Sequence, residues 1–408
     1  MPSGRVKSNF LNCLSSLRYK RSDSIVAIDA WMGSKYADNS RFLFQYLSDH
    51  KDELGLSKVV WLTHNTEVVD TVRALGYECY LLDSKEGVEI HKRAGYLICN
   101  NSPVDDVKLR GEFIAEYSYG AKRINLWHGT GVIKTFAMAS NVYKAKMNRH
   151  PALYRIKLFL YSHNSVFRKL FESYGGWGDC FYLTTSETEK EKFKKCYPMP
   201  DGRFIVSNYP RNCAGIKLTE REQEIVDTIR SYKYSIMYLP TFRDSSSHFD
   251  YTVIADELKD LLERRNILFI QKAHSVMQNS GKVGLDGNAL TLHPDFDVNV
   301  ITPEVTYVLT DYSSILADAL YHRKPVLLYV PDYNEYMSGE RGFASDADML
   351  LSAGLKFSSI ENLKSYLEEY IDEPEHAITD SYKTVRQRIW GREVGLKEIW
   401  ADIRKATI

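Results

Sequence analysis

Short apolar runs rich in β-branched and aromatic residues alternate along the chain with longer stretches of helical periodicity. Such alternation predicts β-α-β crossovers and parallel sheets. The predicted strands of the first half are 25–29, 59–63, 78–82, 96–100 and 124–127, and its helices include 40–48 and 67–75. Those of the second half are 204–207, 235–239, 267–271, 307–309 and 326–330, with helices at 220–232 and 252–265. The pattern predicts an α/β protein of two Rossmann-like, doubly wound domains that face each other across a ligand cleft.

A chain of 408 residues suits two domains of ordinary size. We expect residues 23–200 to form the first domain and residues 201–380 the second. Residues 1–22 form a basic amphipathic segment ahead of them. The stretch 361–371 is predicted to be helical, and residues 381–408 are expected to pack as a helix across both domains.

Composition narrows the possible functions. Lys and Arg together number 53, as do Asp and Glu, so the bulk charge gives no reason to expect nucleic acid as a partner. No run of about 18 apolar residues predicts a membrane-spanning helix. The six cysteines are scattered without a CxxC pair, which favours a reducing compartment and argues against a disulfide framework or a zinc ribbon. We therefore expect a cytoplasmic protein.

The charge is uneven along the chain, because residues 117–171 contain many basic and aromatic side chains and no Asp or Glu. Within this stretch, 152–171 is predicted to be an amphipathic helix. It could be a core-facing helix with a solvated basic face, or it could dock on an anionic membrane surface, as could the basic amphipathic N-terminus. The residues predicted to bind the membrane are Lys144, Lys146, Arg149, Arg155, Lys157, Arg168 and Lys169.

Two histidines follow predicted strands. His128 comes after an apolar strand and is followed by the small residues Gly129, Thr130 and Gly131. His274 lies two residues beyond Lys272 at the end of another strand. A lone histidine at a strand end is often structural, but either side chain could act as a general acid or base near neutral pH. The cleft of a two-domain α/β protein would bring the two together.

Further polar motifs lie at strand ends. The stretch 308–314 leads into a predicted helix, where the serines are either ordinary N-caps or phosphate ligands. Arginines on two predicted loops suit phosphate binding, although a single loop arginine is more often a solvated surface residue. No glycine-rich nucleotide fingerprint and no metal-binding motif occurs. The candidate residues for phosphate binding are Thr241, Arg243, Asp244, Lys272, Thr310, Asp311, Ser313, Ser314, Asp318 and Arg341.

Taken in order, these motifs resemble the CDP-glycerol glycerophosphotransferases, the primases and polymerases of teichoic acid synthesis that use CDP-glycerol or CDP-ribitol. The resemblance covers roughly residues 25–390 and depends on several motifs that keep their order and approximate spacing. The matching pieces are the residues 127–130, 207–212, 239–244, 272–274, 310–314 with Asp318, and 341–343.

The resemblance implies a GT-B-like fold and a catalytic role for His128 and His274. His128 would be the base and His274 would act on the donor phosphates, which Thr310, Ser313, Ser314 and Arg341 would hold. It further implies transfer of glycerol phosphate, or of ribitol phosphate, from a CDP-activated donor to a lipid-linked glycan or a growing polymer. CMP would be released without a metal or another cofactor. It places the enzyme peripherally on the inner face of the cell membrane.

Two other classes fit the same fold. A GT-B glycosyltransferase or an epimerase would act on a nucleotide sugar in the same cleft. A scaffold that kept the fold without catalysis would not need both histidines or the 310–314 motif.

Overall fold

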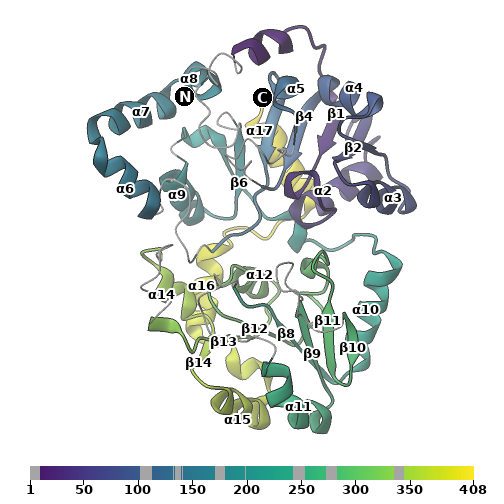
Figure 1. Cartoon of the computed structure of the whole chain (residues 1–408), viewed down its shortest axis with the longest axis vertical. Coiled ribbons are helices and arrows are strands. Elements are labelled where there is room, and N and C mark those ends of the chain that lie inside the picture. Colours follow the sequence, from purple (N-terminus) through teal and green to yellow (C-terminus); the bar gives the residue numbers. More distant parts are fainter. Residues whose placement is uncertain are drawn as a thin grey trace. The chain divides into compact units, whose positions relative to one another are not determined.

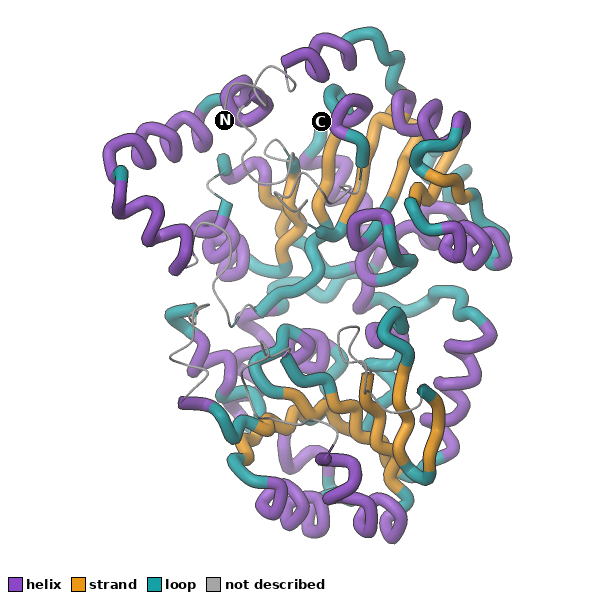
Figure 2. Tube along the Cα trace, viewed as in Figure 1, coloured by secondary structure: helices purple, strands orange, loops and turns teal. Residues whose placement is uncertain are grey.

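The computed structural model describes residues 10–101, 113–131, 133, 139, 141–170, 180–197, 199–241, 253–272, 283–334 and 344–408. The chain divides into two compact units (Figure 1), each with its own sheet. The first unit comprises residues 1–128, 145–219 and 391–408, and the second comprises 129–144 and 220–390. In each unit the strands are flanked by helices (Figure 2).

Seven parallel strands form the sheet of the first unit, counted over the described residues. They are β1 (Ser22–Ile28), β2 (Lys58–Thr63), β3 (Cys79–Leu81), β4 (Ala94–Cys99), β5 (Lys122–Asn125), β6 (Phe181–Thr184) and β7 (Phe204–Val206). Their spatial order is β3-β2-β1-β4-β5-β6-β7. The direction of winding reverses between β1 and β4, and doubly wound sheets bind their ligands beyond the carboxyl ends of the strands at such a reversal.

Helices cover this sheet and extend from it. Among the described residues, those before β6 are η1 (Trp31–Gly33), α2 (Asp38–Asp49), α3 (Thr66–Ala74), α4 (Lys85–Arg93), α5 (Ala115–Ser118), α6 (Asn141–Arg149), α7 (Pro151–His163) and α8 (Ser165–Leu170). The first four residues of α6, 141–144, are counted with the second unit. Those after it are α9 (Glu187–Cys196), η3 (Asp201–Arg203), η4 (Pro210–Asn212) and α17 (Leu396–Ala406). Residues 10–16 are also helical.

The sheet of the second unit has the order β10-β11-β9-β8-β12-β13-β14. Its strands are β8 (Tyr234–Tyr238), β9 (Ile267–Lys272), β10 (Gly284–Asp286), β11 (Ala289–Leu292), β12 (Tyr307–Thr310), β13 (Val326–Tyr329) and β14 (Leu355–Phe357). Only the β10–β11 pair is antiparallel among the described strands. With β10 set aside, the order repeats the winding of the first sheet, and the reversal falls between β8 and β12.

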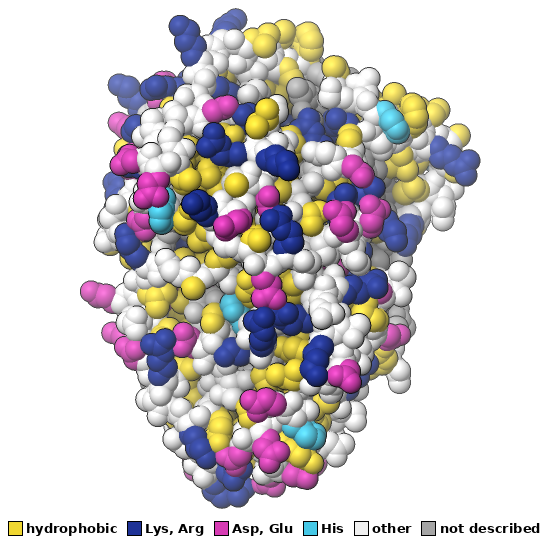
Figure 3. Space-filling model, turned by 180° about the vertical axis from the view of Figure 1, so that it is seen from behind, with side chains coloured by type: hydrophobic (Ala, Val, Ile, Leu, Met, Phe, Trp, Pro, Cys, Tyr) yellow, Lys and Arg dark blue, Asp and Glu magenta, His cyan; other side chains and the backbone are white. Residues whose placement is uncertain are grey.

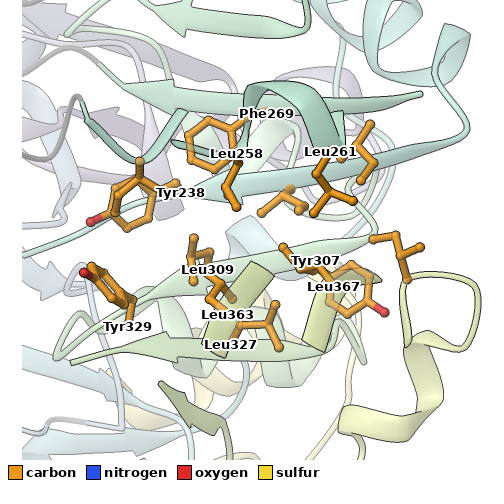
Figure 4. Close-up of a cluster of buried hydrophobic side chains, with 14 of the residues drawn as sticks. Tyr238, Leu258, Leu261, Phe269, Tyr307, Leu309, Leu327, Tyr329, Leu363 and Leu367 are labelled. Atoms are coloured by element: carbon orange, nitrogen blue, oxygen red, sulfur yellow. The ribbon is translucent and has the colours of Figure 1, made fainter. Parts of the chain in front are cut away.

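The core of the second unit lies between its sheet and two helices (Figure 4). Leu258 and Leu261 of α11 (Val253–Arg265) and Leu363 of α15 (Ile360–Tyr370) pack against Phe269 and Leu309 of the strands. The other helices among the described residues of this unit are α10 (Glu220–Ser231), η5 (Val298–Val300), α12 (Ile315–Tyr321), α14 (Ala347–Leu351), η6 (Pro374–Ala377) and α16 (Asp380–Ile389). Burial of these apolar side chains holds the strand ends, and the loops that follow them, in fixed places.

The predicted α/β class and the predicted strands are confirmed, with one reassignment. The strand predicted at 204–207 is β7, which pairs with β6 in the first sheet, so its placement in the second domain is wrong. The units accordingly change over between residues 219 and 220 rather than at 200. The predicted C-terminal helix is two helices, since α16 ends at Ile389 in the second unit and α17 begins at Leu396 in the first.

Candidate active site

His128 lies just beyond the carboxyl end of β5, next to the reversal point of the first sheet. Its ring nitrogen Nδ1 is 2.9 Å from the carbonyl oxygen of Asn100, the residue that follows β4. A carbonyl oxygen can only accept, so Nδ1 carries the proton and donates it. The lone pair of the neutral ring is therefore on Nε2, the nitrogen that can act as a base.

The surroundings of His128 favour its neutral form. Burial lowers the pKa of the imidazole, and the charge of Arg211 lowers it further. The hydrogen bond to Asn100 and the carboxylate of Asp38 act in the opposite direction without reversing the shift. At neutral pH the side chain is consequently an uncharged base.

Two indole rings flank the imidazole. The ring of Trp127 stacks on it with centroids 4.6 Å apart and planes 24° apart, and the ring of Trp31 lies at 5.3 Å. Trp31 is anchored through its backbone N–H, which donates to Oδ1 of Asn100 at 2.9 Å. The same asparagine thus fixes both His128 and one of its aromatic neighbours.

The second unit has its own polar cluster at the reversal point of its sheet. Asp311, directly after β12, accepts two hydrogen bonds from the backbone N–H of Thr241, at 2.8 and 2.9 Å. The hydroxyl of Thr310 donates to the carbonyl of Leu239 at 2.7 Å. Both interactions tie the loop after β8 to the end of β12.

Burial separates the predicted phosphate ligands into two groups. Thr310, Asp311 and Asp318 are at most 2% exposed, and the hydrogen bonds of Thr310 and Asp311 stabilise the loop after β8. Ser313 and Ser314, in contrast, are partly exposed at the start of α12. Ser313 and Ser314 are therefore the more accessible of the phosphate ligands predicted within 310–318, and their role stays a prediction.

The glycines after His128 pack against the same region of α12. A Cβ on Gly129 would lie 3.1 Å from Oγ of Ser314, and one on Gly131 would lie 2.7 Å from Ile389 and 3.1 Å from Ala317. Gly131 also has a φ of +61°, a conformation that favours glycine. These residues are small because the chain passes close to the start of α12 and, at Gly131, to the end of α16.

Lys272 ends β9, and its ammonium group donates to the carbonyl of Phe296 at 2.8 Å. Its side chain is half-buried, so the charge is held at the carboxyl edge of the sheet. The predicted residues His274, Arg243, Asp244 and Arg341 lie outside the described residues.

Sequence reasoning missed four residues around His128: Asp38, Asn39, Asn100 and Arg211. Arg211 occurs in one of the motifs that carry the family resemblance but was not predicted as a site residue. Its guanidinium pairs with Asp38 at 2.8 Å, and both side chains are at most 4% exposed. The sequence did contain local signals of structure, since Asp38 and Asn39 stand at a helix start and Pro210 immediately precedes Arg211. Nothing in it indicated that these two segments meet.

The basic segment is helical but not continuous, since α7 ends at His163 and α8 begins at Ser165. Lys144, Arg149 and Arg155 are exposed and Lys157 is partly exposed, while the side chains of Lys146 and Lys169 lie outside the described residues. Leu153, Ile156 and Phe159 are each at least 60% exposed. Apolar and basic side chains gather at the upper right of Figure 3, the rear view, where α7 lies.

Arg168 differs from the other predicted membrane residues. It is 4% exposed, and its guanidinium donates to the carbonyls of Tyr161 and Ser162 at the end of α7. It therefore caps a helix rather than facing outward, and we remove it from the membrane-binding set.

Arg21, in the predicted basic N-terminal segment, also faces inward. It donates to the carbonyls of His91, Ala94, Tyr117 and Tyr119. The helix that precedes it remains exposed on its apolar side, with Phe10, Leu11 and Leu14 about half exposed, and Leu17, just after the helix, is 82% exposed.

The part of the chain that the structure describes contains no cluster of three side chains able to hold a metal ion. Within the same residues, every helix is too short or too polar to cross a bilayer.

Comparison with known proteins identifies the family to which the chain belongs. The family model described as CDP-Glycerol:Poly(glycerophosphate) glycerophosphotransferase matches residues 11–391. A teichoic acid poly(glycerol phosphate) polymerase of Bacillus spizizenii is 23% identical over 346 residues, which cover 80% of this chain and 78% of that protein. A teichoic acid glycerol-phosphate primase of Bacillus subtilis is 25% identical over 276 residues, covering 66% of this chain and 65% of that protein.

A solved structure of the wall teichoic acid polymerase TagF has the same fold. The two chains superpose with a TM-score of 0.68 at 20% sequence identity, over 97% of this chain and 93% of that chain. Together with the two mostly parallel sheets, this likeness confirms the expected GT-B-like α/β fold. The match over nearly the whole length shows that the chain belongs to the CDP-glycerol:poly(glycerophosphate) glycerophosphotransferase family.

Proposed function

We propose that the protein transfers a polyol phosphate, glycerol phosphate in the first place, from a CDP-activated donor to a hydroxyl of a teichoic acid or capsule polymer, releasing CMP. The observation that carries this proposal is the tautomer of His128, whose Nε2 is a neutral base at the ligand-binding edge of its sheet. Membership of the family supplies the donor class.

The chemistry needs a base and positive charge more than a covalent intermediate. The acceptor oxygen attacks the β-phosphorus of the donor while Nε2 of His128 takes the hydroxyl proton. The bond between the β-phosphorus and the bridging oxygen breaks, and CMP leaves with the bonding electron pair. Hydrogen-bond donors aimed at the phosphate oxygens stabilise the charge that develops there.

On the donor side, we propose Ser313 and Ser314 as hydroxyl donors to the phosphates, since both are partly exposed. Thr241 and Asp311 act indirectly by fixing the loop after β8. His274, Arg243, Asp244 and Arg341 retain the donor-binding roles implied by the family resemblance. A reaction without a resident metal remains a prediction.

The test is acceptor-dependent release of CMP. Purified protein is incubated with CDP-glycerol, CDP-ribitol or a UDP-sugar, with and without a lipid-linked glycan or a short poly(glycerol phosphate) acceptor. We expect CMP from CDP-glycerol only when acceptor is present. CMP release from CDP-ribitol alone would show that the transferred group is ribitol phosphate instead of glycerol phosphate. Turnover of the UDP-sugar alone would overturn the proposal in favour of a glycosyltransferase or an epimerase.

The dependence of the rate on pH follows from the partly buried position of His128. As the pH falls, the imidazole gains a proton and loses the lone pair that accepts the acceptor's proton, so the rate falls. Because the pKa of His128 is lowered from 6.5, we expect the acidic limb of kcat/KM below that value. A profile with CDP-glycerol measures the limb, and a midpoint above 6.5 would contradict a base that is neutral at pH 7 because its pKa is lowered.

We further propose that a lipid-linked acceptor is reached by docking of the helical surface α6–α8 on an anionic membrane. The exposed apolar residues Leu153, Ile156 and Phe159 support insertion at the headgroup level, and the exposed cations around them support attraction to anionic lipid. The helix at residues 10–16 would add a second apolar contact.

Vesicle binding tests this docking. Each Lys or Arg near the surface contributes about 1 kcal/mol, so replacing Arg149, Arg155 and Lys157 together by Gln should weaken binding to phosphatidylglycerol vesicles about 100-fold. Salt should weaken binding of the unmodified protein. The matched control replaces three exposed cations of α17, Lys397, Arg404 and Lys405, and should bind normally. Equal binding to phosphatidylcholine vesicles would contradict the electrostatic part of the proposal.

A further inference from the structure

The backbone carbonyls of the three successive residues 126–128 accept hydrogen bonds from two side chains, those of Asn39 and Arg211. Nδ2 of Asn39 donates to the carbonyl oxygens of Leu126 at 3.2 Å and of Trp127 at 2.9 Å. Nη1 of Arg211 donates to the carbonyl oxygen of His128 itself at 2.8 Å. Every peptide oxygen from residue 126 to residue 128 thus has a defined partner.

The donors are bound to each other as well. Nη1 of Arg211 lies 2.8 Å from Oδ1 of Asp38, and the same carboxylate oxygen accepts from the backbone N–H of Asn39 at 2.7 Å. The backbone N–H of Arg211 donates to Oδ1 of Asn39 at 3.2 Å. Asp38 and Asn39 open α2, whereas Arg211 belongs to η4, more than 170 residues later, so the network joins distant segments of the first unit.

The backbone that these bonds hold is an unusual one. Trp127 has a φ of +58°, in the left-handed region that a bulky side chain rarely adopts. Asp38 has a φ of +64° and is strained in the same sense. Such conformations persist only where surrounding interactions over-determine them, and they cluster at functional sites. The turn at Trp127 directs the following residue toward Asn100, where Nδ1 finds its acceptor.

We propose that Arg211, Asp38 and Asn39 are positioning residues that fix the backbone of residues 126–128, so that His128 meets Asn100 through Nδ1 and presents Nε2 as the base. This inference depends on the proposed function, because it assigns those residues to the reaction through His128. None of the three needs to touch the substrate. Without the network, the turn at Trp127 would relax and the ring would lose its fixed orientation.

The two charges of the network act on His128 in opposite directions. The carboxylate of Asp38 raises the pKa of the imidazole and the guanidinium of Arg211 lowers it. Removing the charge of Arg211 alone should therefore raise the pKa of His128, and removing that of Asp38 alone should lower it further. The pKa of His128 is therefore a second readout of the network, separate from the rate.

The principal test variant replaces both charged partners, Asp38→Asn with Arg211→Met, so that no buried charge is left alone. We expect kcat for CMP release to fall about 100-fold with the KM for CDP-glycerol within about twofold, because a misplaced base slows chemistry and not donor binding. Nitrogen NMR of histidine-labelled protein, with His128 assigned from a His128→Gln sample, should show loss of the single Nδ1–H tautomer. Arg211→Lys keeps the charge and should retain an intermediate kcat.

Arg21→Met is the matched control. Arg21 is also an inward-facing arginine that donates to several backbone carbonyls, but those belong to residues 91, 94, 117 and 119. Its loss should lower stability without changing the His128 tautomer or kcat by more than about twofold. A double variant with normal kcat and an unchanged tautomer would overturn the proposal.

The variants distinguish the role of His128 as the base from the positioning role of Arg211, Asp38 and Asn39. If His128→Gln itself retained full activity, the base assignment would fall, yet the NMR spectra would still show whether Arg211 and Asp38 fix the ring. If His128→Gln were inactive and the double variant normal, only the positioning role would be lost.

Discussion

Replacing His128 with Gln is expected to lower acceptor-dependent CMP release by about 10³-fold at neutral pH while leaving the affinity for CDP-glycerol within about twofold. The amide of glutamine is uncharged and close in volume to the imidazole, so it can occupy the same space beside the indole rings. It has no lone pair of comparable basicity to accept the proton. The loss should therefore appear in kcat and not in donor binding.

Single-turnover CMP release and calorimetric titration with CDP-glycerol separate these two effects. His50→Gln is the matched control, since Nδ1 of His50 also lies 3.0 Å from a backbone carbonyl, that of Tyr46, and its ring also stacks on an aromatic neighbour. It should retain normal activity. Retention of more than about a tenth of the activity by His128→Gln would rule out His128 as the base.

Deleting residues 391–408 is expected to unfold the first unit and spare the second. Four side chains of α17 are buried in the first unit: Leu396, Ile399, Trp400 and Ile403. Each contributes about 1.5–3 kcal/mol on burial, so together they contribute about 6–12 kcal/mol. That equals most or all of the stability of an ordinary domain, about 5–15 kcal/mol.

Hydrogen exchange followed by mass spectrometry distinguishes the two units. In the truncated chain, peptides from β1, β2 and β4 should exchange rapidly, while those from β8, β9 and β12 stay protected. The single change Trp400→Ala should cost about 3–5 kcal/mol, because its ring is 2% exposed and packs on Tyr96. Lys397→Ala, on the exposed side of the same helix, should change little. Full protection of the first sheet after truncation would contradict this account.

The sequence predicted the central strands well for a physical reason. Strands of parallel sheets are buried on both faces and are therefore continuous apolar runs, as β4 and β13 are. It could not assign β7, because three residues, Phe204–Val206, contain no information about which sheet they join. That choice depends on backbone pairing with β6, an interaction between segments that only the folded chain brings together.

The site was predictable in part for a similar reason. His128 was found because it follows an apolar strand and precedes small residues, a local pattern. Arg211 was not, since an arginine on a loop is usually solvated, and only the fold buries it against Asp38. Thr310 was assigned to phosphate because hydroxyls near helix starts often bind it, whereas the structure uses that hydroxyl to join two strand ends.

The division of the chain also determines the order in which the protein can assemble during synthesis. The second unit is complete once residue 390 has been made, whereas the first unit lacks α17 until residues 391–408 have been made. At about 5–20 residues per second, residues 220–408 take about 10–40 s to translate. During that time the surface later covered by Trp400 and its neighbours stays open on the nascent chain, where a ribosome-associated chaperone could bind it. The unit that holds the proposed base therefore completes its fold after the other unit.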